Sequence, residues 1–142
     1  MRPEVATAIA AHARREHPRE CCGILLGVGD ELVEAVAAQN VAAEPARHYE
    51  VSPADHIAQI RRCRDTAKAG GTSLAILGVY HSHPQSAPVP SPTDLDRAWG
   101  EYVYLIAGPA NGSAPLEIRA YRLDGERFID VPLTPTPAVE ME

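Results

Sequence analysis

Residues 74–84 read LAILGVYHSHP, an apolar run that ends in two histidines and a proline. The apolar part, residues 74–80, shows no alternation of polar and apolar side chains, which is typical of a central strand covered on both faces. Glycine-containing turns at residues 27–30 and at Asp124-Gly125 predict two hairpins. We expect further strands at residues 22–27, 32–36, 49–51, 103–107, 116–121 and 127–131.

Three helices are expected, and each begins at a proline, in the first-turn position where a missing N–H costs nothing. The second and third follow a serine that can cap a helix. Start and stop signals place these helices at residues 3–17, 53–69 and 92–99. Together, the strands and helices predict an α/β (α+β) fold class, a single mixed β-sheet flanked by helices.

Length and charge limit the classes of function. The chain has 142 residues and a mass of 15.3 kDa, which fits one domain of about 100–200 residues. We expect this domain over residues 1–131, followed by a frayed Pro/Thr-rich tail at 132–142. The net charge of −6 argues against nucleic acid or anionic lipid as the main partner. No apolar run approaches the roughly 20 residues of a transmembrane helix, so partners should be proteins or small molecules.

The cysteines indicate a reducing compartment. Three cysteines cannot all pair, and Cys21 and Cys22 are adjacent, which disfavours an ordinary disulfide. At least one of these two should pack in the core as a small hydrophobic side chain. The alanine-rich start of the chain contains Glu4 and makes a weak signal-peptide core. We therefore expect a cytoplasmic protein.

The two histidines after the apolar run give the first chemical signal. At a strand end, His81 and His83 point to the same side, although this pattern alone also fits a polar loop. Asp94, in the first turn of the third helix, strengthens a metal-binding interpretation. Two His and one Asp leave a fourth position open, as in catalytic zinc sites. The remaining histidines show no ligand pattern and are expected at the surface or at helix ends: His12, His17, His48 and His56.

A catalytic zinc also needs a proton acceptor and a donor for the developing oxyanion. Glu20 is the candidate base, because it precedes the strand at 22–27, where desolvation would raise its pKa. An ordinary surface carboxylate is the alternative interpretation of Glu20. Ser91 is the candidate donor, but it could serve only as the cap of the third helix. Both roles of Ser91 are compatible if its hydroxyl faces the metal.

Taken in order, Glu20, His81-Ser82-His83-Pro84 and Ser91-Pro92-Thr93-Asp94 resemble the full signature of the JAMM (MPN-plus, Mov34/JAB) metalloproteases. That signature is an upstream Glu, H-x-H-P, a short spacer and S-x-x-D. Residues 18–27, PRECCGILLG, are similar to the P-x-E-x-C-G-x-L-x-G start of small prokaryotic members. The resemblance extends over roughly residues 1–131 and implies a JAB/MPN-like fold of the cytidine-deaminase-like type.

The resemblance implies that His81, His83 and Asp94 bind one Zn²⁺ per chain, with a water in the fourth position. Glu20 would deprotonate this water and pass the proton to the leaving nitrogen, and Ser91 would hydrogen-bond the oxyanion. Family members cleave peptide or isopeptide bonds at the C-terminus of ubiquitin or ubiquitin-like proteins, and small bacterial relatives are associated with sulfur carriers that end in Gly-Gly. The expected function is a zinc-dependent metallopeptidase or isopeptidase that releases cysteine or another adduct from such a carrier.

Other functions stay open at this stage. A catalytically silent MPN scaffold would bind partners only, and a metallopeptidase could act on an unrelated peptide. A nucleoside deaminase is excluded, because the chain lacks the Pro-Cys-x-x-Cys ligands. The residues do not decide between Gly–Lys, Gly–Cys and ordinary peptide bonds. An edge strand at 116–121 could pair across a homodimer.

Overall fold

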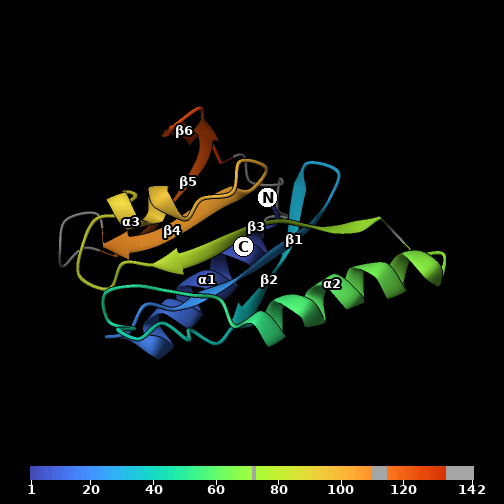
Figure 1. Cartoon of the computed structure of the whole chain (residues 1–142), viewed down its shortest axis with the longest axis horizontal. Coiled ribbons are helices and arrows are strands. Elements are labelled where there is room, and N and C mark those ends of the chain that lie inside the picture. The colour runs from blue at the N-terminus through green and yellow to red at the C-terminus, as the bar shows by residue number, and fades with distance from the viewer. Residues whose placement is uncertain (72, 110–114, 134–142) are drawn as a thin grey trace, which may run out of the picture.

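A computed structural model of the chain describes residues 1–71, 73–109 and 115–133. Within them, six strands form one sheet in the order β2-β1-β3-β4-β5-β6 (Figure 1). The predicted fold class, a single mixed sheet with flanking helices, is confirmed. The strands are β1 (Cys22–Val28), β2 (Glu31–Ala38), β3 (Leu74–Ser82), β4 (Val103–Pro109), β5 (Leu116–Asp124) and β6 (Arg127–Val131), and the helices are α1 (Pro3–Glu16), α2 (Pro53–Lys68) and α3 (Pro92–Asp96).

The sheet is mixed because β3 and β4 run parallel, whereas the other four neighbouring pairs are antiparallel. Parallel neighbours need a crossover of about a dozen residues or more, since a tight turn cannot join them. Here residues 83–102 make the crossover and contain α3. The crossover leaves the carboxyl end of β3, which is the edge at which sheets with parallel strands commonly bind ligands.

α1 supplies the core of one face of the sheet. Val5, Ile9 and Ala13 lie one turn apart and are buried, as their spacing predicts. Because side chains alternate across a strand, Tyr80 points toward this core and His81 points to the opposite face. Cys21, just before β1, also belongs to this core, together with the sheet residues Leu25, Leu32, Tyr80, Val103, Leu105, Ala107 and Ala120.

α2 lies along β3 and covers it incompletely (Figure 1). None of the residues of α2 is buried, and Ile57 and Ile60 are 47% and 48% exposed. Near the end of β3, Tyr80 and His81 are buried, whereas Ala75 near its start is exposed. The prediction that this strand is covered on both faces is therefore correct for the part of β3 that carries His81. The prediction is wrong for the start of β3.

Residues 49–51 do not form the predicted strand. Val51 makes only an isolated bridge with Asn40. The neighbouring backbone groups, the carbonyl of His48 and the N–H of Glu50, bond instead to the side chain of Asn40. The side chain of Asn40 therefore makes the hydrogen bonds that a neighbouring strand would otherwise make with this loop.

α3 is shorter than the predicted helix and ends at Asp96 rather than Trp99. The N–H of Trp99 donates to the hydroxyl of Tyr104 on β4 instead of to a helix carbonyl. This contact ties the end of the crossover to the sheet.

Both hairpins turn on a glycine in the left-handed conformation, because a residue without Cβ adopts it at no steric cost. Gly29 has a φ of 61° and Gly125 a φ of 67°. The second turn lies at residues 125–126, one residue later than predicted, because Asp124 still pairs with Arg127 in the ladder.

β5 lies between β4 and β6 and is not an edge strand. Pairing of residues 116–121 across a homodimer, as proposed from the sequence, is therefore wrong for this strand. The edges of the sheet in the described part of the chain are β2 and β6.

The described chain ends inside the predicted tail. Leu133 is partly buried and packs against the core, and the rest of the tail, residues 134–142, lies outside the described residues. Among the helices of the described ranges, none has the length and hydropathy to cross a membrane.

Candidate metal centre

Three ligand-type side chains meet at the carboxyl end of β3. His81 belongs to the strand, His83 follows it directly, and Asp94 lies in the first turn of α3. The Nε2 atoms of the two histidines are 3.2 Å apart, and each is 3.3 Å from Oδ2 of Asp94. These atoms form a nearly equilateral triangle that could hold a metal ion.

The triangle has the size that a tetrahedral zinc site requires. Zinc binds imidazole nitrogen and carboxylate oxygen at about 2.1 Å, so two such ligands at the tetrahedral angle lie about 3.4 Å apart. The observed separations of 3.2 and 3.3 Å fit this value. Three protein ligands also leave one coordination position open, as in catalytic sites.

Hydrogen bonds hold two of the three ligand-type side chains in place. Nδ1 of His83 lies 2.9 Å from the carbonyl of Ala87. A carbonyl can only accept, so Nδ1 carries the proton and Nε2 keeps a lone pair for a metal. The N–H of Ser91 donates to Oδ2 of Asp94 at 2.8 Å. Both contacts come from the crossover between β3 and β4.

His81 is the most buried of the three, with 1% of its surface exposed. Tyr49 stacks on its ring, with centroids 4.2 Å apart and planes inclined by 16°. Its Nδ1 is buried and has no hydrogen-bond partner among the described residues. Burial lowers the pKa of His81, which favours the neutral ring that a metal binds. Burial alone would raise the pKa of Asp94, but the neighbouring imidazoles of His81 and His83 and the N–H of Ser91 hold this pKa well below its ordinary range.

Glu20 lies two residues before β1 and faces the same region. Glu20 is 7% exposed and lines a cavity of about 310 Å³ together with His83. Burial raises the pKa of Glu20 from 4.5 to about 7. The charge of His83 lowers this pKa, and the charge of Asp94 raises it further. A carboxyl group with this pKa can exchange protons near neutral pH. The alternative of an ordinary surface carboxylate is therefore wrong.

Ser82, between the two histidines, joins them to the segment of Glu20. The hydroxyl of Ser82 accepts from the N–H of Cys21 at 2.8 Å, and the N–H of Ser82 donates to the carbonyl of Cys21 at 3.1 Å. Next along the ladder, Cys22 pairs with His81. Because Glu20 directly precedes Cys21, this pairing sets the position of the acid relative to the histidines.

Ser91 and Asp94 form a capping box. The Ser91 hydroxyl accepts from the N–H of Asp94 at 3.1 Å, while the Asp94 carboxylate accepts from the N–H of Ser91. Ser91 thus caps α3, as one of its two interpretations predicted. Accepting this bond leaves the O–H of Ser91 available as a donor, so the capping role and an oxyanion role are compatible.

Most of this chain is similar in sequence to known proteins. Residues 2–124 match the family described as prokaryotic homologs of the JAB domain. The chain belongs to this family. A desampylase of Haloferax volcanii is 41% identical over 109 residues, 72% of this chain and 74% of that protein. A CysO-cysteine peptidase of Mycobacterium tuberculosis is 27% identical over 124 residues, 87% of this chain and 81% of that protein.

The JAB fold is also shared by a protein of Desulfitobacterium hafniense whose solution structure is known. The two structures superpose with a TM-score of 0.74 at 24% sequence identity. The match covers 98% of this chain and 93% of that one.

The structure brings all five predicted site residues of this JAB-family chain to one region. His81, His83 and Asp94 form the triangle, Ser91 bonds to Asp94, and Glu20 shares a cavity with His83. Three further residues around the site were not predicted as functional: Asn40, Tyr49 and Ser82. Of these, only Ser82 had a signal in the sequence, its place inside the His-x-His pattern. Asn40 and Tyr49 belong to a loop without periodicity.

The cysteines of the JAB domain are free thiols. Cys21 and Cys22 are both buried, as predicted for at least one of them, and burial raises their pKa to about 11 and about 12. The prediction for His12 was wrong, because it is 5% exposed and its Nδ1 lies 2.7 Å from the hydroxyl of Tyr80. His12 follows Ile9 by three residues and therefore lies on the buried face of α1.

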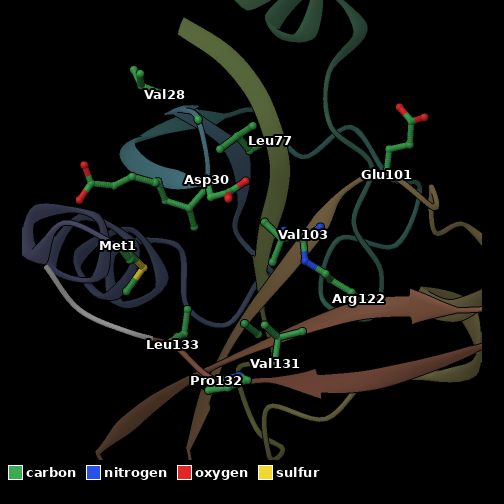
Figure 2. A pocket seen from close by; sticks show the side chains of 14 residues that line it. Met1, Val28, Asp30, Leu77, Glu101, Val103, Arg122, Val131, Pro132 and Leu133 are labelled. Carbon is green, nitrogen blue, oxygen red and sulfur yellow. The ribbon is translucent and has the colours of Figure 1, made fainter. Parts of the chain in front are cut away.

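A larger cavity of about 750 Å³, whose lining residues Figure 2 draws, includes none of His81, His83 and Asp94 in its lining. Leu77, Val103 and Arg122 are among the residues that line it. Leu77 precedes His81 by four residues, about 13 Å along an extended strand. None of the five predicted site residues is among the described residues that line this cavity.

Proposed function

We propose that the chain is a JAMM-type zinc metallopeptidase that hydrolyses the bond after the C-terminal Gly-Gly of a ubiquitin-like sulfur carrier protein. The observation that carries this proposal is the triangle of His81, His83 and Asp94 next to the buried Glu20. It combines a set of metal ligands with a proton acceptor in one place. The names of the two relatives, a desampylase and a CysO-cysteine peptidase, support the class of reaction and of substrate.

His81, His83 and Asp94 would hold the zinc ion. Bound zinc polarises a carbonyl group and makes water more acidic. Glu20 takes the proton of the attacking water and gives it to the leaving nitrogen, for which its pKa of about 7 is suitable. The hydroxyl of Ser91 donates a hydrogen bond to the oxygen that becomes negatively charged, while it continues to accept from the N–H of Asp94.

The leaving group in this proposal is the amine of cysteine or of another adduct on the carrier. The reaction belongs in the cytoplasm, since the three free thiols suit a reducing compartment. The direct test uses small Gly-Gly-ended ubiquitin-like proteins of the source organism, each with a C-terminal cysteine or short extension. Each is incubated with the zinc-loaded protein and its intact mass is measured.

A mass loss back to the Gly-Gly terminus is the expected result, and it identifies the leaving group. The Glu20→Gln variant is the control, because it should bind one zinc ion per chain and leave the carrier unchanged. Turnover by this variant would remove Glu20 from the mechanism. No mass loss with any carrier, despite bound zinc in the wild type, would contradict the proposed function and favour an unrelated peptide substrate or a scaffold.

A further inference from the structure

The carboxamide of Asn40, just after β2, uses its full hydrogen-bonding capacity. Nδ2 donates to the carbonyls of Glu20 and His48, at 2.9 and 3.0 Å. Oδ1 accepts from the N–H groups of Ala42 and Glu50, both at 3.0 Å. The partners are backbone carbonyls and N–H groups, so the orientation of the amide is unambiguous.

These bonds join the segment of Glu20 to the loop at residues 40–51. The carbonyl of Glu20 accepts from Asn40, and its N–H donates to the carbonyl of Pro45 at 2.7 Å. Both backbone polar groups of Glu20 are thus bound by the loop. These two hydrogen bonds fix the backbone of Glu20. The fixed backbone limits the positions that the Glu20 carboxyl group can take relative to His83.

The same amide fixes the part of the loop that contacts the histidines. His48 and Glu50, which bond to Asn40, are the two neighbours of Tyr49 in the chain. Tyr49 in turn stacks on His81. One side chain therefore connects the acid on one side of the centre with the aromatic ring that packs on a ligand-type histidine.

We propose that Asn40 is a positioning residue, which holds the backbone of Glu20 and the loop around Tyr49 in register with the His81, His83 and Asp94 cluster. This inference rests on the proposed function for its catalytic consequence. The residue type is specific, because aspartate supplies no donor for the two carbonyls and alanine supplies neither donors nor acceptors.

The test replaces Asn40 with Ala and measures hydrolysis of the cleavable carrier at saturating zinc. We expect kcat to fall about 10- to 100-fold, as is typical when supporting contacts of an active site are lost, with KM unchanged. Gln39→Ala is the matched control, since Gln39 is the exposed neighbour of Asn40 and, within the described part of the chain, bonds through its backbone alone. It should keep the wild-type kcat.

A readout that does not depend on turnover is amide hydrogen exchange by NMR. Loss of the Asn40 side chain must speed exchange at Ala42 and Glu50, whose bonds it removes. The proposal further requires faster exchange at the N–H of Glu20, whose partner is Pro45 and not Asn40. A merely local role of Asn40 would leave the Glu20 amide as protected as in the wild type, and this result would overturn the proposal.

A wild-type kcat for Asn40→Ala, or an increase in KM alone, would also overturn it. If Asn40→Ala does not fold, Asn40→Asp takes its place, since it keeps the shape of the side chain and both acceptor contacts. Failure of both variants to fold would show that the amide is needed for folding as a whole, against a positioning role. Absence of turnover in the wild type would count against the proposed function alone, because the exchange experiment still decides the role of Asn40.

Discussion

At the scale of single residues, the metal centre contains polar groups that are held away from water. Glu20 is buried with a raised pKa, and Nδ1 of His81 is buried without a partner among the described residues. A buried donor without a partner costs about 1–3 kcal/mol, and a buried carboxylate is destabilised relative to its protonated form. These buried polar groups therefore reduce the stability of the fold.

This cost should be visible as a pH-dependent gain in the Glu20→Gln variant. The folded protein binds the proton of Glu20 more tightly than the unfolded chain, so its ionisation removes stability as the pH rises from 4.5 through about 7. Gln cannot ionise. In the metal-free protein, we expect the variant to gain up to about 3 kcal/mol in free energy of unfolding at pH 8, and less at pH 5.

Urea unfolding in the presence of a chelator, at both pH values, measures this difference. Glu44→Gln is the control for loss of a negative charge, because Glu44 is exposed in the neighbouring loop. An equal gain at pH 5 and pH 8 would contradict the assignment of a raised pKa to Glu20.

Tyr49 should contribute to metal affinity through its ring rather than its hydroxyl. A stacked pair of rings is worth about 0.5–1.5 kcal/mol, so loss of the stack on His81 should weaken zinc binding about 2- to 10-fold. Competition with a chromophoric chelator measures the dissociation constant. Tyr49→Leu should show the loss and Tyr49→Phe should not. Equal affinities of the two variants would show that stacking does not orient His81.

At the scale of elements, the site depends on how closely β1 approaches β3. The ring of Tyr80 lies directly over Gly23, its partner in the β1·β3 ladder, where a Cβ atom would overlap with it. Tyr80 cannot move away easily, because it is buried and its hydroxyl bonds to His12. Any displacement of Tyr80 would also shift His81, the next residue in β3.

Gly23→Ala should therefore destabilise the protein by about 1–3 kcal/mol, the usual cost of adding a methyl group to a packed core. Gly100→Ala is the matched control, because a Cβ atom there meets nothing within 4 Å. Thermal unfolding of both variants in the metal-free state is the measurement. Equal midpoints would mean that the Tyr80 ring can shift without cost.

The elements also show how far the sequence could predict the fold and the site. The proximity of His81, His83 and Asp94 was predictable, because strand alternation and a capped helix bring together side chains that are close in the chain. The loop at 49–51 was misassigned, because its backbone groups bond to the Asn40 side chain, which no local pattern indicates. His12 was misplaced, although its spacing from Ile9 puts it on the buried face of α1; its hydrogen-bond partner, the hydroxyl of Tyr80, is distant in the chain and had no signal in the sequence.

At the scale of the whole molecule, metal binding and folding should be coupled. A ligand that binds only the folded state at 100 times its dissociation constant stabilises it by about 2.7 kcal/mol. We therefore expect a chelator to lower the unfolding temperature and one equivalent of zinc to restore it. Differential scanning fluorimetry with and without zinc measures this change.

The zinc-dependent shift should disappear in Asp94→Asn and persist in Asp96→Asn. Asp96 is a matched control, because it is an exposed carboxylate on the same helix, outside the ligand triangle. A shift that survives in Asp94→Asn would place the stabilising metal elsewhere.

The position of β3 between β1 and β4 has a consequence for synthesis on the ribosome. Glu20 is translated early, before β1 and β2, and the ligand-type residues 81–94 follow much later as one short stretch. β1 can pair with β2 while the chain is still growing, but its other edge stays unpaired until β3 arrives. Because the proposed activity needs Glu20 together with His81, His83 and Asp94, we expect an incomplete nascent chain that ends before Asp94 to lack it.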